Sequence, residues 1–230
     1  MKKADRELTR ENKKVKTILD NLLAELGQAY DQSNIKQVCL KRGHEWHYSL
    51  ITTTMKKGGP LILGFNWGAS QDEKYLPQAT IIETVFKSGD VGSLSRIFPY
   101  CEKYFGNDFL ERTSQSNYCF FRSKNESEIT SKDIALCEQI FNRLIEVIEP
   151  SSILCFSSKL RDYLFSNGKV QAKESIKISY KRGSVQMTYE PIRATLTSGA
   201  EIMFLPHPNY PMKKEARDEA WKFCCDGRVL

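Results

Sequence analysis

Apolar residues recur at three- and four-residue steps along much of the chain, which is the period of an amphipathic helix. Between residues 6 and 30 this pattern predicts one helix, with Gly27 as a plausible end. A second periodic segment predicts a helix that is capped by Thr130 or Ser131 and ends at Ile148. Further helices are predicted at 93–105, with a kink or late start at Pro99, at 160–165 and at 213–225.

Three short runs of apolar residues predict strands that are buried on both faces of a sheet, at 60–64, 152–156 and 201–205. Weak alternation over 174–196 predicts a further pair of strands, and residues 48–55 have the composition of an edge strand. Because buried strands alternate with helices, we expect an α/β fold, a three-layer α/β/α arrangement with a short, central, mainly parallel sheet.

Composition is ordinary for a globular protein, since 40% of the 230 residues are hydrophobic and 27% are charged. The net charge of +6 mildly favours an anionic partner such as nucleic acid. The seven cysteines form no C-x-x-C pair, which favours reduced thiols in a cytoplasmic protein and argues against an iron–sulfur cluster. No secretory signal or membrane-spanning run is evident, and we expect a monomer that does not contact a membrane.

Polar residues stand where the predicted buried strands end, and in parallel sheets ligands bind at such ends. The first strand runs into Gly64-Phe65-Asn66-Trp67-Gly68, and the last runs into His207-Pro208-Asn209. Between them, Asn117-Tyr118-Cys119 opens a short aromatic segment. Each motif alone also fits a structural role, as a turn asparagine, a histidine satisfied within a proline turn, or an asparagine that caps backbone groups. His44 and His47 are too isolated for a metal site, and we expect none.

Together and in this order, the three motifs resemble the uracil-DNA glycosylase superfamily, most closely its single-strand-selective monofunctional branch, and also its mismatch-specific branch. The strand and turn at 153–159 add to the resemblance, which covers roughly residues 45–225. We therefore expect a uracil-DNA glycosylase-like domain over 45–230, preceded by an N-terminal helical extension over 1–44.

The resemblance implies hydrolysis of the bond between a base and its sugar in DNA, without metal or cofactor, on a nucleotide turned out of the stack or taken from a single strand. Asn66 would position the attacking water, and neutral His207 would donate a hydrogen bond to uracil O2. The base would be bound by Gly64, Phe65, Trp67, Tyr75 and Asn117. The DNA, single- or double-stranded and carrying uracil or a damaged base, would be contacted by Ser157, Ser158, Lys159, Pro208, Asn209, Tyr210, Met212, Lys213 and Lys214.

Two features favour an alternative: Trp67 stands where the family has proline, and the loop after Gly68 carries the acids Asp72 and Glu73. A third departure, Asn209 where the family has serine, is mild, because asparagine can still bind a phosphate or backbone group. The alternative is a catalytically inactive glycosylase-like domain that binds nucleic acid or a nucleotide. An unrelated α/β hydrolase or nucleotide-binding protein ranks last, because the sequence contains neither a Gly-x-Ser-x-Gly elbow nor a phosphate-binding Gly-Lys-Ser/Thr loop.

Overall fold

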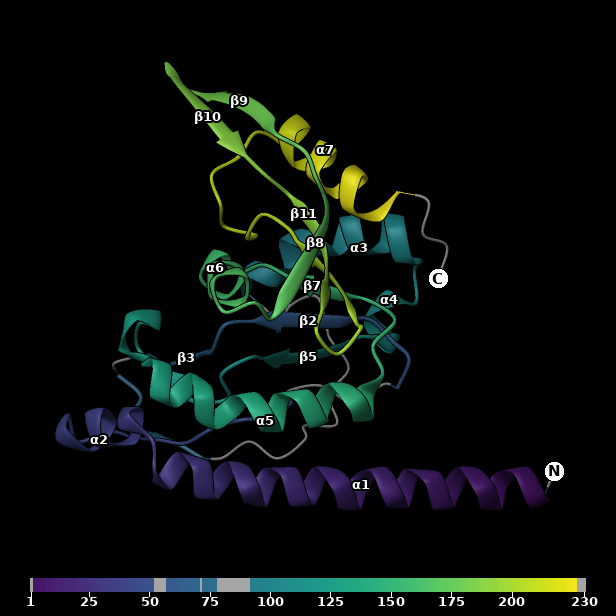
Figure 1. Cartoon of the computed structure of the whole chain (residues 1–230), viewed down its shortest axis with the longest axis vertical. Helices are drawn as coiled ribbons and strands as arrows, with labels where there is room; N and C mark the ends of the chain where they lie inside the picture. Colours follow the sequence, from purple (N-terminus) through teal and green to yellow (C-terminus); the bar gives the residue numbers. More distant parts are fainter. Residues whose placement is uncertain (1, 52–56, 71, 78–91, 227–230) are drawn as a thin grey trace.

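Helices pack against both faces of a central sheet (Figure 1). The computed structural model describes residues 2–51, 57–70, 72–77 and 92–226, and over these residues the chain is a mixed α/β protein. Its seven described α-helices are α1 (Lys2–Asp31), α2 (Asn34–Lys41), α3 (Phe98–Phe105), α4 (Phe109–Arg112), α5 (Ser131–Ile148), α6 (Ser158–Ser166) and α7 (Lys214–Cys225).

The central sheet has six strands in the order β5-β2-β7-β12-β11-β8. The first four of these pair in parallel, whereas β11 runs antiparallel to both its neighbours. The prediction of a mainly parallel, short sheet is therefore confirmed. The strands are β2 (Leu61–Gly64), β5 (Ser114–Asn117), β7 (Ile153–Cys155), β8 (Val170–Ser175), β11 (Ile192–Leu196) and β12 (Glu201–Phe204).

Successive side chains of β2 enter two different hydrophobic cores, one on each face of the sheet, as expected when a strand is buried on both faces. Leu61 and Leu63 belong to the core that includes α1 and α5, whereas Ile62 belongs to the core that includes α3 and α7. Helices thus cover both faces of the sheet, in agreement with a three-layer arrangement.

Three small two-stranded sheets accompany the central one. β1 (Glu45–Trp46) pairs with β4 (Tyr75–Leu76), β3 (Trp67–Gly68) pairs with β6 (Arg122–Ser123), and β9 (Ile178–Arg182) pairs with β10 (Val185–Tyr189). The pair of strands expected over 174–196 is present as β9 and β10, and the same segment also contains β11 and the end of β8. β8 and β11 complete the central sheet, while β9 and β10 extend as a hairpin beside α7 (Figure 1).

The first helix continues past Gly27 and ends at Asp31, so the predicted end at Gly27 was wrong. A Cβ atom at Gly27 would lie 2.7 Å from the Tyr48 hydroxyl, which indicates that close packing requires this glycine. From Leu19 onward, buried residues of α1 share one core with the central sheet. The boundary expected after residue 44 remains a prediction, but the core is continuous across it.

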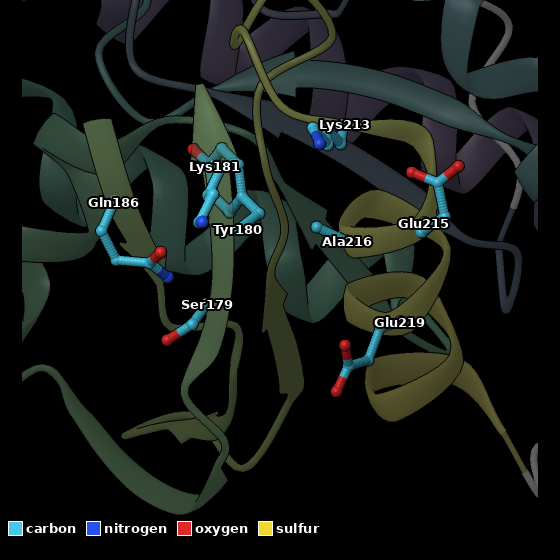
Figure 2. A pocket seen from close by; sticks show the side chains of 8 residues that line it. All are labelled: Ser179, Tyr180, Lys181, Gln186, Lys213, Glu215, Ala216 and Glu219. Atoms are coloured by element: carbon cyan, nitrogen blue, oxygen red, sulfur yellow. The ribbon is translucent and has the colours of Figure 1, made fainter. Parts of the chain in front are cut away.

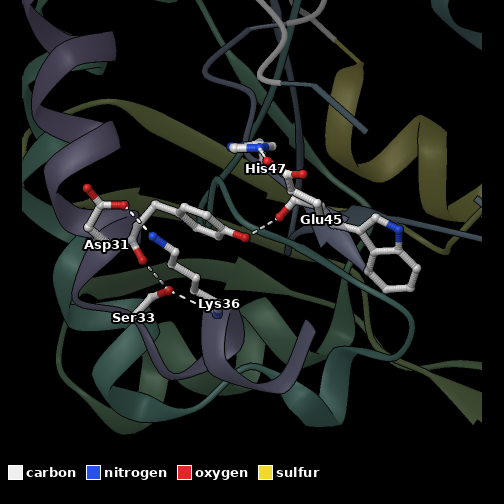
Figure 3. Close-up of polar contacts among 7 residues, drawn as sticks. Asp31, Ser33, Lys36, Glu45 and His47 are labelled. Carbon is white, nitrogen blue, oxygen red and sulfur yellow. Dashed lines mark hydrogen bonds and ion pairs between the residues drawn. The ribbon is translucent and has the colours of Figure 1, made fainter. Parts of the chain in front are cut away.

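The turn between α1 and α2 is held by polar contacts that Figure 3 shows. The Ser33 hydroxyl caps α2 by accepting from the Lys36 backbone N–H at 3.2 Å, and it donates to the Tyr30 carbonyl at 2.7 Å. The Lys36 ammonium lies 2.7 Å from the Asp31 carboxylate.

The edge strand expected at 48–55 lies partly outside the described residues. Among the described ones, Tyr48 forms an isolated antiparallel β-bridge with Phe121.

Asp133 joins the start of α2 to the start of α5. One of its carboxylate oxygens accepts from the backbone N–H groups of Asn34, at 2.7 Å, and Ile35, at 3.2 Å. The other accepts from the backbone N–H of Thr130 at 2.9 Å and from its hydroxyl at 2.6 Å, which completes a capping box. The predicted cap at Thr130 is confirmed.

All seven cysteines are buried thiols. Over the described residues, the structure contains no helix with the length and apolar character that crossing a bilayer requires.

Candidate functional site

The polar motifs of the sequence meet at one edge of the central sheet. Since β5, β2, β7 and β12 are parallel, their carboxyl ends lie side by side, with Gly64 opposite Asn117 and both Leu63 and Phe204 opposite Cys155. The chain runs from β2 to β5 on one side of β2 and then returns to β7 on its other side, so the strand order reverses between β2 and β7. In α/β proteins, ligands bind in the crevice at such a switch point.

Asn66 follows β2 and is held by its side-chain nitrogen. This nitrogen donates to the Ser123 hydroxyl at 2.8 Å, to the Trp67 carbonyl at 3.0 Å and, at 3.5 Å, to the Phe121 carbonyl. Because the NH₂ group is used within the protein, the carbonyl oxygen Oδ1 is the end that remains for a ligand or a water molecule.

Asn117 ends β5 and lies directly beside the end of β2. It is only 5% exposed, and a Cβ atom at Gly64 would clash with its Oδ1. An amide of this kind can present both a donor and an acceptor to the edge of a heterocyclic base.

His207 lies on the turn after β12, where it is exposed to solvent. The surrounding protein removes part of the ring's hydration, and this lowers the pKa of His207 below its ordinary value of 6.5. The charge of Glu126 raises the pKa, and the charge of Arg217 lowers it. Its Nδ1 accepts from the backbone N–H of Asn209 at 3.1 Å. A neutral ring that accepts through Nδ1 carries its proton on Nε2, so Nε2 is the available donor.

Arg217 holds this turn against α7. Its guanidinium donates to the His207 carbonyl at 3.1 Å and to the Tyr210 carbonyl at 2.7 Å. A further bond closes the turn itself, from the Tyr210 N–H to the His207 carbonyl at 2.8 Å. The position of the imidazole therefore depends on α7 as well as on β12.

Lys159 covers the ring of Phe65 at the switch point. Its ammonium lies 4.4 Å from the centre of the Phe65 ring and also donates to the Glu126 backbone carbonyl. The neighbouring Ser157 caps α6, with its hydroxyl accepting from the Leu160 N–H at 3.1 Å, and Ser158 is exposed. A base that stacked on Phe65, which is 2% exposed, would have to displace the Lys159 side chain.

The other two aromatic residues expected near the base lie in different surroundings. Trp67 is 9% exposed, and its indole N–H donates to the Ser49 carbonyl at 2.6 Å, so the ring anchors the turn to the protein interior. Tyr75 is 60% exposed on β4 and meets His47 edge-on, with ring centroids 6.1 Å apart. Base contact by either residue remains a prediction.

The residues expected to contact DNA after His207 divide into two groups. Pro208 is buried, and Tyr210 and Met212 pack against the small core beneath the β9–β10 hairpin. Asn209, Lys213 and Lys214 are exposed, and the Asn209 side-chain oxygen accepts from Arg96 at 2.9 Å. Insertion of Tyr210 or Met212 between DNA bases would therefore require this core to open.

Lys213 also lines a groove of about 410 Å³ between the hairpin and α7 (Figure 2). Lys181 lies on the hairpin side of the groove, while Glu215 and Glu219 belong to the helix. None of Asn66, Asn117 and His207 lines this groove, so it is separate from the candidate site.

Three residues of the site were missed by sequence reasoning. Ser123 contacts Asn66, Glu126 contacts Lys159 through its carbonyl and influences His207 through its charge, and Arg217 holds the turn of His207. The segment around Ser123 has neither a glycine-bounded motif nor a buried-strand pattern, so no sequence signal distinguishes it.

The two histidines that flank β1 show no metal-site geometry. His44 stacks on Trp46 with ring centroids 4.5 Å apart, and Nε2 of His47 lies 3.1 Å from the Glu45 carboxylate. No group of three or more His, Cys, Asp or Glu side chains suited to a metal ion occurs within the described ranges.

Comparison of the whole chain with known protein families and with curated proteins gives no match.

Proposed function

We propose that this protein is a DNA glycosylase that hydrolyses the N-glycosidic bond of uracil or a related damaged base. The observation that carries the proposal is that Asn66, Asn117 and His207 each stand at, or shortly after, the carboxyl end of one of four neighbouring parallel strands. The resemblance in sequence assigns these three residues complementary tasks, and their hydrogen bonding is compatible with each task.

In the proposed reaction the bond between the sugar C1′ and the base nitrogen breaks, and its electron pair leaves with the base. Nε2–H of neutral His207 would donate to the base oxygen on which negative charge develops, which lowers the barrier by electrostatic stabilisation. A neutral donor suits this task, and both the lowered pKa of His207 and the bond to its Nδ1 favour that form.

Water is the nucleophile in this scheme. Oδ1 of Asn66 would accept a hydrogen bond from the water and thereby turn a lone pair toward C1′, while the released proton passes to solvent. The buried amide of Asn117 would recognise the donor and acceptor groups on the edge of the base. No metal or organic cofactor takes part in these steps.

The alternative, binding of nucleic acid or a nucleotide without catalysis, is favoured by two observations. Lys159 occupies the face of Phe65 on which a base would stack. Asp72 and Glu73, both exposed, would repel a nearby phosphate. Under this alternative the protein binds DNA in a salt-sensitive manner and releases no base.

The deciding experiment uses single- and double-stranded oligonucleotides that carry one uracil, followed by alkaline cleavage of abasic sites. Asn66→Ala and His207→Leu are each expected to lower the single-turnover rate by about 10²–10⁴-fold. Asn167→Ala is the matched control, because this exposed asparagine caps the end of α6. Absence of base release by the wild type on uracil, hypoxanthine and mismatched thymine would favour the binding function.

A further inference from the structure

We infer that Ser123 is the positioning residue for Asn66. Ser123 is 1% exposed and lies on β6, beside the turn that carries Asn66. Its hydroxyl accepts from the side-chain nitrogen of Asn66 at 2.8 Å and donates to the Asn125 carbonyl at 2.8 Å. The two bonds form a directed chain that begins at Asn66 and ends on the backbone.

The hydrogen-bond partners of the Asn66 side chain determine which end of its amide faces inward. The carbonyls of Trp67 and Phe121 are acceptors only, so the group that contacts them must be NH₂. Ser123 accepts the shortest of the three bonds, and its own proton is already directed to Asn125. An inverted amide would place Oδ1 against two carbonyl oxygens, which is repulsive.

Backbone pairing holds the hydroxyl in place before any ligand binds. Gly68 lies opposite Ser123 in the β3–β6 pair, and the Ala69 N–H donates to the Ser123 carbonyl at 3.0 Å. The turn after β2 and the segment that carries Ser123 therefore form one unit. This pairing restrains the turn that carries Asn66, in which Trp67 stands where the family that the sequence resembles has a rigid proline.

The consequence for catalysis rests on the proposed function. If Asn66 orients the attacking water, the water must meet the acceptor Oδ1, because an NH₂ group would instead occupy the lone pair that attacks C1′. Ser123 would thus act through Asn66 and touch neither the water nor the base. Removal of its hydroxyl is expected to slow the chemical step and to leave DNA affinity unchanged.

The first test is independent of activity and uses the ¹⁵N-labelled full chain without DNA. The side-chain NH₂ resonances of Asn66 are identified by their loss in Asn66→Ala. In Ser123→Ala, hydrogen exchange of this NH₂ group is expected to accelerate roughly tenfold, whereas Ser123→Thr retains the hydroxyl and the slow exchange. Ser33→Ala is the matched control, because Ser33 is a buried serine with a similar pair of bonds in the cap of α2.

The second test measures single-turnover base release from a single-stranded uracil oligonucleotide. Ser123→Ala is expected to be about 10–100-fold slower than the wild type, with a Kd within about twofold, and Ser123→Thr is expected to recover most of the rate. Unchanged Asn66 exchange in a folded Ser123→Ala variant would overturn the inference. If the wild type released no base, the proposed function would fail, while the exchange measurement would still decide the role of Ser123.

Discussion

Replacement of Asp133 by alanine tests the account of how the N-terminal helices join the rest of the protein. The side chain is fully buried and accepts from the backbone N–H groups of Asn34, Ile35 and Thr130. Loss of an N-cap contact of this kind costs about 0.5–2 kcal/mol. Each buried N–H that is left unpaired costs roughly 1–3 kcal/mol, although water reaches part of this junction.

Together these losses predict that Asp133→Ala lowers the free energy of unfolding by about 3–5 kcal/mol, a large fraction of the 5–15 kcal/mol typical of a domain. For a chain of this size the midpoint of thermal unfolding would fall by about 10 °C. Asp133→Asn keeps one acceptor oxygen and is expected to lose roughly half as much.

Urea unfolding followed by circular dichroism measures these differences. Asp20→Ala is the matched control, because Asp20 forms an exposed ion pair with Lys16 at 2.8 Å. Exposed pairs contribute little, so this variant should remain within about 0.5 kcal/mol of the wild type. An Asp133→Ala protein as stable as the Asp20→Ala control would refute the proposed junction between α2 and α5.

Two further predictions concern the candidate site, and a third concerns the separate groove between the β9–β10 hairpin and α7. Gly64→Ala should displace the Asn117 amide, which would lower the free energy of unfolding by about 1–3 kcal/mol. The same change should raise KM for uracil-containing DNA, and an unchanged KM would show that Asn117 does not contact the base. Because the folded pKa of His207 is lowered below 6.5, its neutral form and the base-release rate should persist at pH 6.5 and decline only at more acidic pH. A pH profile that follows an ordinary histidine would contradict this environment. Replacement of both Lys181 and Lys213 by alanine should reduce the salt dependence of DNA binding by roughly 0.7 in slope per lost phosphate contact, and an unchanged slope would exclude phosphate contact in the groove.

The buried strands and the long helices were predictable because their side chains carry the pattern on their own. Leu61–Leu63 and Ile153–Cys155 are apolar without interruption, as buried parallel strands are, and Thr130 precedes a long periodic helix. The pairing shows that the carboxyl ends of β2, β7 and β12 are neighbours, and Asn66 follows β2 while His207 follows β12. That these two residues form one site remains a prediction.

The elements that were missed depend on partners distant in sequence. β1 and β3 are two residues long and exist only through pairing with β4 and β6. Gly27 was taken for a helix end because the Tyr48 side chain that requires a glycine there is not visible in local sequence. Ser123 belongs to the same class, since its role arises only when β6 lies against the turn of Asn66.

The buried thiols provide an intrinsic reporter of protein opening. Burial raises the pKa of Cys39 to about 11 and that of Cys155 to about 12, so these groups are protonated as well as shielded near neutral pH. A thiol-specific reagent added to the native protein should therefore modify cysteines only during local or global unfolding. Because Cys39 lies on α2 and Cys155 lies on β7, their separate rates of modification would show whether the N-terminal helices detach before the sheet opens.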